Sequence, residues 1–553
     1  MGYADVDALF AKRFEEGLAP GLVYGVVEHG EVIHAGAFGT VSLTDGAAPT
    51  VDSVFRIASM SKSFTAAALL LLRDRGPVRL DDPVTEYVPE LAGHSSGPAI
   101  TLRSLLTMGA GLLTDDPWGD RQESLADDEF GVLLEGGITV GRAPGLGFEY
   151  SNLGYAVLGR VINKVAGNYR EFVERELVAP LGMTATRYAA GDLGPALVPG
   201  HVKRGADWVE LEPVSPGAFS AMGGLHSSVA DLARWVHGFV TAFEAAPDGH
   251  PLAKASRCEM QQLQRLGAVD ASLAGPSGLT AAATGYGMGL SVLHDSQLGH
   301  FAMHSGGYPG YGSRMAWHPA SGLGVVTLSN GTYAGAYQQA DDALRLLVRR
   351  RGVATPRPRL AVTADWITTV TARLAAFRPD RPWIDAALMA DNVALDTSDD
   401  ERRQRIADAR EQVGAPLAGP PSEPYSRAMA HAAWIVPAER GRYEVEILLT
   451  PEAVPRLQTV TVTGIGSAPA GSVEQVHRAL AGDQAALVRA FGEPVVVSAP
   501  VATNADATEF LVEAGPTWWK ATLADARVTF EPHPAAAYPR LAWLAQQLRA
   551  LAA

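Results

Sequence analysis

The sequence contains almost no cysteine and no concentration of positive charge. Cys258 is the single cysteine among 553 residues, which excludes an intramolecular disulfide and argues against a thiolate metal site. The formal net charge is −15, and a chain of this charge repels phosphate backbones and anionic membranes. The 14 histidines lack the spacing of metal ligands. We therefore expect no nucleic-acid or membrane partner, no metal and no cofactor.

Long apolar runs and an N-terminal export signal are also missing. The most apolar short stretch, residues 66–72, is too brief to cross a bilayer. Residues 1–5 lack the basic start and apolar core of a secretory signal, so a cytoplasmic protein is expected. Hydrophobic residues make up 47% of the chain and charged residues 19%, as in ordinary globular proteins. The length predicts two or more domains.

The residue pattern predicts an α+β fold. Strand-like segments on either side of a turn at residues 29–30 indicate a β-hairpin at residues 22–28 and 32–35, and further strand-like segments follow at residues 287–294, 301–305, 315–318 and 324–329. Residues 101–240 are predicted to form an all-helical subdomain. Residues 1–352 would then combine an antiparallel sheet, flanking helices and this subdomain. Pro and Arg at residues 353–359 indicate a linker, and residues 360–553 are expected to form a smaller α+β domain whose role the sequence leaves open.

Ser59 and Lys62 form the strongest chemical signal. They are three residues apart on a predicted apolar helix over residues 59–75, so both side chains lie on one face. Only six of the 45 basic residues are lysines. A desolvated lysine can lose its proton whereas arginine effectively cannot, which suits a general base. The pair alone is equally compatible with a surface lysine that happens to follow a serine.

Two further segments carry suitable groups. Tyr150 and Asn152 lie just before an apolar helix, where a phenol with a pKa lowered by a cationic lysine can move protons and an amide can bind a carbonyl group. Alternatively, the tyrosine packs its ring and the asparagine caps the helix. Residues 304–307, His-Ser-Gly-Gly, lie on a predicted strand whose glycines let a substrate approach backbone N–H groups. A tight hairpin is the alternative there.

The order and spacing of these three motifs are more specific than any one of them. Ser-x-x-Lys, Tyr-x-Asn and His-x-Gly follow one another as in the serine β-lactamase and penicillin-binding-protein superfamily, and residues 5–350 resemble its class C-like branch of esterases, D-aminopeptidases, D-amidases and acyltransferases. Several other stretches also resemble this family: residues 55–58, 100–107, 180–183, 223–227 and 285–289.

The resemblance implies a role for each motif. Ser59 would attack a carbonyl carbon, and Lys62 and Tyr150 would exchange its proton and later protonate the leaving group. Asn152 would orient the substrate and Lys62. The backbone N–H groups of Ser59 and Gly307 would form the oxyanion hole.

The third motif departs from the β-lactamases and carboxypeptidases of the family, which usually carry Lys-Thr-Gly there. His304, Ser305 and Gly306 stand in its place and are expected to contact the substrate, but the permanent cation associated with a substrate carboxylate is missing. Residues 115–121 match no calcium loop, and we expect them to form a structured loop at the rim of the cleft, with Trp118 in contact with the substrate.

We therefore expect a serine hydrolase that forms an acyl-enzyme on an ester or an amide, with a small molecule or short peptide as substrate. An acyltransferase that passes the acyl group to an amine or alcohol is the first alternative, because water exclusion by the cleft cannot be read from sequence. A β-lactamase or D-Ala carboxypeptidase ranks lower. A non-catalytic ligand sensor would not need the reactive set. The oligomeric state is left open.

Overall fold

The structure is a computed structural model of the chain. It describes residues 2–466, except residues 45, 93–97, 274–278, 353–359, 423, 425 and 427, and beyond them five strands between Val495 and Pro532. The predicted linker at residues 353–359 lies outside the described residues. The chain divides into two compact units, of which the first contains Met1–Ala271 and Ala281–Val353 and the second contains Ser272–Thr280 and Ala354–Ala553.

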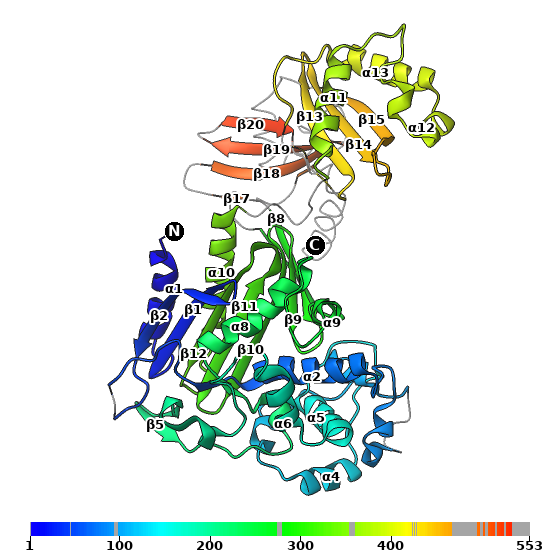
Figure 1. The fold of residues 1–553 in the computed structure, drawn as a ribbon. Helices are drawn as coiled ribbons and strands as arrows, with labels where there is room; N and C mark the ends of the chain where they lie inside the picture. Colours follow the sequence, from blue (N-terminus) through cyan, green and yellow to red (C-terminus); the bar gives the residue numbers. More distant parts are fainter. Residues whose placement is uncertain are drawn as a thin grey trace. The chain divides into compact units, whose positions relative to one another are not determined.

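An eight-stranded sheet forms the centre of the first unit (Figure 1), with the strand order β2-β1-β12-β11-β10-β9-β8-β7. The N-terminal hairpin thus pairs with the last strand, and Leu22 lies opposite Ser329. The strands are β1 (Gly21–Glu28), β2 (Glu31–Gly39), β7 (Arg265–Leu273), β8 (Leu279–Tyr286), β9 (Ser291–Asp295), β10 (Gly299–Tyr308), β11 (Tyr311–His318) and β12 (Leu323–Ser329). The predicted α+β class is confirmed. The strand expected from residue 287 begins only at Ser291, because Gly287 N–H bonds to Leu290 O at 2.8 Å and closes a turn.

Helices cover both faces of this sheet. Side chains alternate between the two faces along a strand, and in β1 Tyr24 belongs to one buried cluster and Val23 to another. The Tyr24 cluster includes residues of α1 (Ala4–Glu15) and α10 (Tyr337–Arg351). The Val23 cluster includes residues of α2 (Ser61–Arg75) and α8 (Val229–Val240). The sheet is therefore covered on both faces, which agrees with the nearly continuous apolar sequence of β1.

The remaining helices of the first unit gather beside α2 (Figure 1). They are α3 (Leu102–Leu106), α4 (Asp127–Glu135), α5 (Asn152–Ala166), α6 (Tyr169–Val173), α7 (Ser220–Gly223) and α9 (Lys254–Met260). The all-helical prediction for residues 101–240 is wrong at two places: β4 (Gly200–Arg204) and β5 (Asp207–Leu211) form a hairpin, and the short strand β6 (His226–Ser227) pairs with β3 (Phe55–Arg56). Gly205 has a φ of 63° in its turn, a conformation that glycine adopts without strain and that suits a tight hairpin.

The second unit contains a three-stranded antiparallel sheet of β13 (His431–Ala438), β14 (Gly441–Leu449) and β15 (Leu457–Gly466). Its helices are α11 (Thr363–Ala375), α12 (Asp391–Asp396) and α13 (Asp399–Val413). Trp366 and Val370 of α11 share a buried core with Tyr443 and Ile447 of β14. A further sheet has the order β16-β18-β19-β20, with β17 beside β18; these strands are β16 (Val495–Val497), β17 (Ala502–Thr503), β18 (Ala507–Ala514), β19 (Thr517–Ala524) and β20 (Arg527–Pro532).

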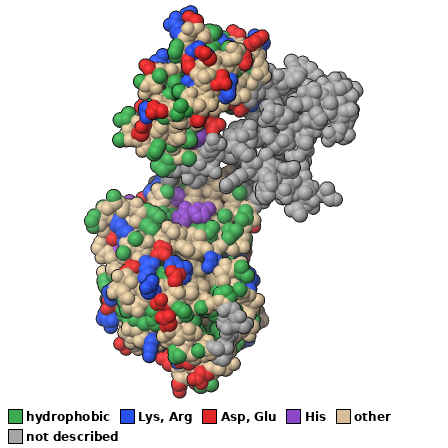
Figure 2. Space-filling model, turned by 90° about the vertical axis from the view of Figure 1, so that its right-hand side faces the viewer, with side chains coloured by type: hydrophobic (Ala, Val, Ile, Leu, Met, Phe, Trp, Pro, Cys, Tyr) green, Lys and Arg blue, Asp and Glu red, His purple; other side chains and the backbone are tan. Residues whose placement is uncertain are grey.

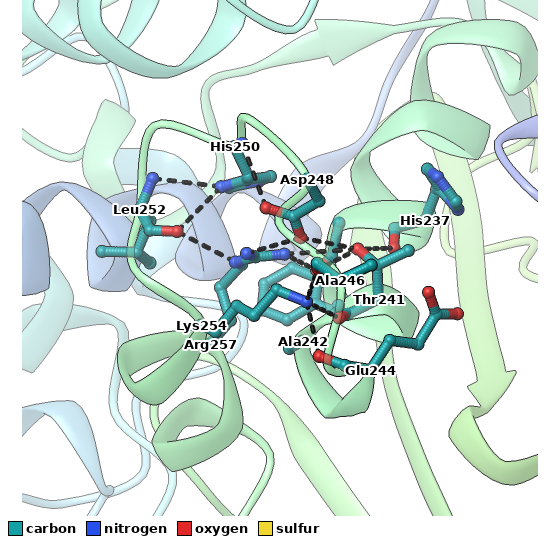
Figure 3. Close-up of polar contacts among 12 residues, drawn as sticks. His237, Thr241, Ala242, Glu244, Ala246, Asp248, His250, Leu252, Lys254 and Arg257 are labelled. Carbon is teal, nitrogen blue, oxygen red and sulfur yellow. Dashed lines mark hydrogen bonds and ion pairs between the residues drawn. The ribbon is translucent and has the colours of Figure 1, made fainter.

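A buried arginine connects the ends of α8 and α9 in the first unit (Figure 3). Arg257 is 1% exposed, and its Nε donates to Leu252 O at 2.9 Å. Its Nη2 lies 2.7 Å from Oδ2 of Asp248. Burial alone would raise the pKa of Asp248, but hydrogen bonds from Arg257, His250 N–H and Thr241 lower it to about 2. The carboxylate is therefore charged at neutral pH and compensates the buried guanidinium.

This cluster supports the helix on which the first turn of α2 packs. Nε1 of Trp235 in α8 donates to Ser63 Oγ at 3.0 Å, and its ring stacks on Phe64 at a centroid distance of 3.9 Å. Ser63 Oγ in turn donates to Met60 O at 2.8 Å. The position of residues 59–62 therefore depends on α8.

Removal of the Asp248 carboxylate should destabilise the first unit. The Asp248→Ala variant leaves the Arg257 charge buried without its counterion, which costs about 3–5 kcal/mol when a buried pair is broken from one side. We expect a lower midpoint of urea unfolding, followed by tryptophan fluorescence. Asp207→Ala at an exposed position of β5 is the matched control and should change the free energy of unfolding by less than about 0.5 kcal/mol. Equal midpoints for the two variants would contradict this role of the pair.

Candidate active site

Ser59 lies in a strained turn between β3 (Phe55–Arg56) and α2. Ala58 has a φ of 48°, a left-handed conformation that costs a residue with a Cβ atom about 1–2 kcal/mol. The sheet holds this turn: Ser313 Oγ donates to Ile57 O at 2.8 Å, and a Cβ at Gly306 would lie 2.2 Å from the same carbonyl oxygen. Gly306 is therefore required for the close approach of β10 to the turn.

Lys62 is completely buried and its amine is bonded on three sides. Nζ lies 2.9 Å from Ser59 Oγ, 2.7 Å from Asn152 Oδ1 and 2.8 Å from Met222 O. A protonated amine has three N–H donors for these three oxygens. A neutral amine has two, and its lone pair can then accept the Ser59 proton. The predicted contact between Ser59 and Lys62 is present.

The surroundings of Lys62 shift the pKa of its amine toward neutral pH. Burial lowers the pKa of Lys62 to about 8, against the opposing effect of four carboxylates, of which Asp116 has the largest effect, followed by Asp120, Asp115 and Glu123. A free lysine has a pKa near 10.4. A substantial fraction of the amine is therefore neutral in mildly alkaline solution.

Tyr150 completes the group around Ser59. Its ring centroid lies 5.0 Å from Lys62 Nζ. The expected lowering of its pKa is wrong: burial raises the pKa of the phenol well above 10, although a hydrogen bond with Ser59 opposes the shift. Desolvation penalises the phenolate more than the nearby amine stabilises it. Tyr150 is thus a neutral phenol, which can give a proton before it takes one.

Asn152 begins α5 and is held from two directions. Its Nδ2 donates to Asp116, and its Oδ1 accepts from Lys62. Asp115 accepts the backbone N–H groups of Asn152 and Leu153, both at 2.7 Å, and so caps the helix. Asn152 is fully buried. It contacts Lys62, while its roles in orienting Lys62 and the substrate stay predictions.

His304 is neutral and both of its ring nitrogens are occupied. Nδ1 lies 2.6 Å from the carbonyl oxygen of Ser305, which can only accept, so Nδ1 carries the proton. Nε2 then accepts from the hydroxyl group of Tyr286 at 2.9 Å. Burial, and to a lesser degree Lys62, lower the pKa of His304 to about 3. The ring is therefore uncharged at neutral pH, and its predicted contact with substrate stays a prediction.

The backbone of β10 offers the predicted oxyanion donor at an open edge. β9 pairs with β10 only from Gly299 to Met303 in the described strands. A two-residue turn joins Tyr308 to Tyr311, so these two residues form a hydrogen-bonded pair between β10 and β11. Gly307 and Gly312 form the next pair, which in an antiparallel ladder is not hydrogen-bonded. The N–H of Gly307 therefore points away from β11. Its role with Ser59 in binding an oxyanion stays a prediction.

The loop before η4 (Gly119–Gln122) lies over Asn152. A Cβ at Gly119 would be 2.7 Å from the Cβ of Asn152, so this loop and the start of α5 are in direct contact. Trp118 is 44% exposed, and its ring contacts Phe219 edge-on at 5.8 Å. An exposed face of Trp118 is available to a ligand, and its predicted substrate contact is untested.

Three neighbours of the site were not predicted from sequence. Tyr286 lies between His304 and Tyr150, whose ring centroid is 6.3 Å from that of Tyr286. Asp116 holds Asn152, and the carbonyl group of Met222 accepts from Lys62. Tyr286 belongs to the stretch 285–289 that resembles the family, which was the one available signal. The other two contacts join distant segments through a loop carboxylate and a backbone atom, for which sequence holds no pattern.

Histidine side chains gather on one face of the first unit (Figure 2). The rings of His294 and His300, opposite each other on β9 and β10, are 4.9 Å apart. Over the described residues, however, no group of three or more His, Cys, Asp or Glu side chains is arranged to hold a metal ion. In the same part of the chain, no helix has both the length and the apolar composition needed to cross a bilayer.

The chain is similar to several known proteins. The chain is 26% identical to penicillin-binding protein 4* of Bacillus subtilis over 332 residues, which covers 57% of this chain and 68% of that protein. It is 29% identical to esterase EstB of Burkholderia gladioli over 378 residues, which covers 63% of this chain and 95% of that protein. The octameric penicillin-binding protein homologue from Pyrococcus abyssi has a similar fold, with a TM-score of 0.55 and 18% identity over 96% of this chain and 99% of that one. The family model for beta-lactamase matches residues 6–350, and the chain belongs to the beta-lactamase family.

Proposed function

We propose that the protein is a serine hydrolase that forms an acyl-enzyme on Ser59 from an ester or an amide. One observation carries the proposal: the completely buried amine of Lys62 lies 2.9 Å from Ser59 Oγ and has a pKa lowered to about 8. A binding protein has no need to hold a partly neutral amine against a hydroxyl group. The esterase relative supports the same class of reaction.

The first step is attack by Ser59. The neutral Lys62 amine accepts the Ser59 proton while Oγ forms a bond with the carbonyl carbon of the substrate. The carbonyl oxygen becomes negative and is bound by the N–H groups of Ser59 and Gly307. Lys62 is then an ammonium group, which Asn152 Oδ1 and Met222 O stabilise at 2.7 and 2.8 Å.

Collapse of this intermediate expels the leaving group, which requires a proton. Tyr150 is well suited to give it, because burial keeps its phenol protonated. Tyr150 donates to the leaving oxygen or nitrogen and is reprotonated by the Lys62 ammonium group. Water then attacks the acyl-enzyme, and the same groups act in reverse order.

The charge of the site favours substrates without a carboxylate. His304 stands where relatives of the β-lactamase type usually carry lysine, and its pKa of about 3 leaves it uncharged at neutral pH. Asp116 and Asp120 are near enough to Lys62 to raise its pKa, and they add negative charge to the site. We therefore infer an ester or amide substrate with an uncharged or cationic acyl group, and rank β-lactams and C-terminal D-Ala peptides lower.

Labelling with a fluorophosphonate probe should identify the nucleophile. Intact-mass measurement is expected to show one adduct on the wild type and none on Ser59→Ala, because the probe reacts with an activated serine hydroxyl. Ser124→Ala, at an exposed position, is the matched control and should label like the wild type. An adduct retained in Ser59→Ala would place the nucleophile elsewhere.

The pH dependence of ester hydrolysis should report the Lys62 amine. We expect kcat/KM to rise about tenfold per pH unit on the acidic side and to level off near pH 8, the pKa of Lys62. Lys62→Arg should lower kcat by about 100-fold or more at every pH, since the guanidinium group cannot act as a base. A profile that is flat from pH 6 to pH 9 would exclude this base.

A substrate panel should separate the candidate substrate classes. Loss of a charge-assisted contact to the substrate carboxylate removes about 1.5–3 kcal/mol of binding, or about 10–100-fold in kcat/KM. We expect p-nitrophenyl esters or D-amino-acid amides to exceed nitrocefin by at least that factor. Faster turnover of nitrocefin would instead identify a β-lactamase.

A further inference from the structure

The loop from Asp115 to Gly119 holds Asn152 in a way that the resemblance to the family does not assign. Asp115 binds the backbone N–H groups of residues 152 and 153, one with each oxygen, at 2.7 Å. Asp116 accepts the amide Nδ2 of Asn152. Gly119 packs against the same side chain so closely that a Cβ would lie 3.0 Å from its Nδ2.

These contacts decide which end of the Asn152 amide faces Lys62. A carboxylate can only accept, so the amide group turned toward Asp116 must be NH2. The oxygen Oδ1 then faces Nζ of Lys62, at 2.7 Å. Without Asp116 the amide would be free to rotate, and its NH2 could oppose the donors of Lys62.

We propose that Asp115 and Asp116 are positioning residues of the catalytic site: Asp115 fixes the start of α5, and Asp116 fixes the amide of Asn152, so that Lys62 is held against Ser59. The inference rests on the proposed function, since it concerns the general base of that reaction. Neither carboxylate reacts with the substrate in this scheme. Asp115 is half-buried and Asp116 is exposed.

Asp116 also has an electrostatic effect on Lys62, which has to be separated from positioning. Charged and titratable groups face Lys62 from every element around it. They are Asp115 and Asp116 in the loop, Asp120 in η4, Glu123 just after η4, Tyr150 just before α5, Tyr155 within α5, and His304 on β10. Asp116 raises the pKa of Lys62 more than the other carboxylates do. Its removal should lower that pKa, so the acidic limb of the pH profile should move to lower pH.

The test compares three variants with the wild type, using a p-nitrophenyl ester, a D-amino-acid amide and the fluorophosphonate probe. Asp116→Ala removes both the acceptor and the charge, Asp116→Asn keeps an acceptor oxygen but removes the charge, and Asp120→Asn removes a nearby charge that does not contact Asn152. Asp120 accepts from Tyr333 at 2.8 Å instead. Each variant is measured for kcat, KM and the pH profile, and circular dichroism checks that it folds.

We expect Asp116→Ala to lower the plateau kcat by about 10–100-fold with little change in KM, the size of loss that a misplaced catalytic group produces. Asp116→Asn should recover most of that kcat and still show the acidic limb at lower pH. Asp120→Asn should shift the limb in the same direction and keep a kcat well above that of Asp116→Ala.

Three results would overturn the inference. They are a wild-type kcat in Asp116→Ala, an Asp116→Asn variant as impaired as Asp116→Ala, and a loss confined to KM for amine-bearing substrates, which would make Asp116 a substrate-binding carboxylate. In each of these cases the wild type is active and the proposed function stands. A wild type that neither hydrolyses the ester nor reacts with the probe overturns the proposed function and the inference together.

Discussion

The hydrogen bonds of the buried Lys62 amine are the interaction on which the first unit depends. Ser59, Asn152 and Met222 supply the three acceptors, and they belong to the turn before α2, to α5 and to α7. An unpaired buried ammonium group would cost several kcal/mol. The packing of these helices is therefore constrained by a polar group, and any movement of one helix leaves an unsatisfied donor beside Ser59.

The same arrangement sets the chemistry through a balance of two opposing effects. Burial favours the neutral amine, and the carboxylates of the 115–123 segment favour the charged one. Either effect alone would leave lysine unsuitable, because a fully charged amine cannot take a proton and a strongly depressed one is a weak base. The resulting Lys62 pKa of about 8 depends on residues far along the chain that hold these carboxylates in place. Arg56 pairs with Glu123 at 2.8 Å in the interior, and Tyr333 is bonded to Asp120.

The parts of the site that sequence could predict are those with a local geometry. Ser59 and Lys62 are one helical turn apart, so their contact follows from helix periodicity alone. Asn152 required the resemblance, because 90 residues separate it from Lys62. The pKa of Tyr150 was predicted in the wrong direction, since burial is a property of the folded state. In the fold, α2 and β1 lie close to the ranges that their residue patterns predict. The strand β13 and the hairpin of β4 and β5 were not predicted, because their side chains lack a regular alternation of apolar and polar residues.

His304 places a neutral ring at the position where a lysine of the third motif would place a permanent charge. The imidazole bonds to Tyr286 and to the Ser305 carbonyl group, so it fixes the end of β10 from within and presents no charge to the cleft. The ring is coupled to Lys62 by charge, because Lys62 lowers the pKa of His304. A permanent cation at position 304 would therefore lower the pKa of the Lys62 amine as well as act on a bound substrate.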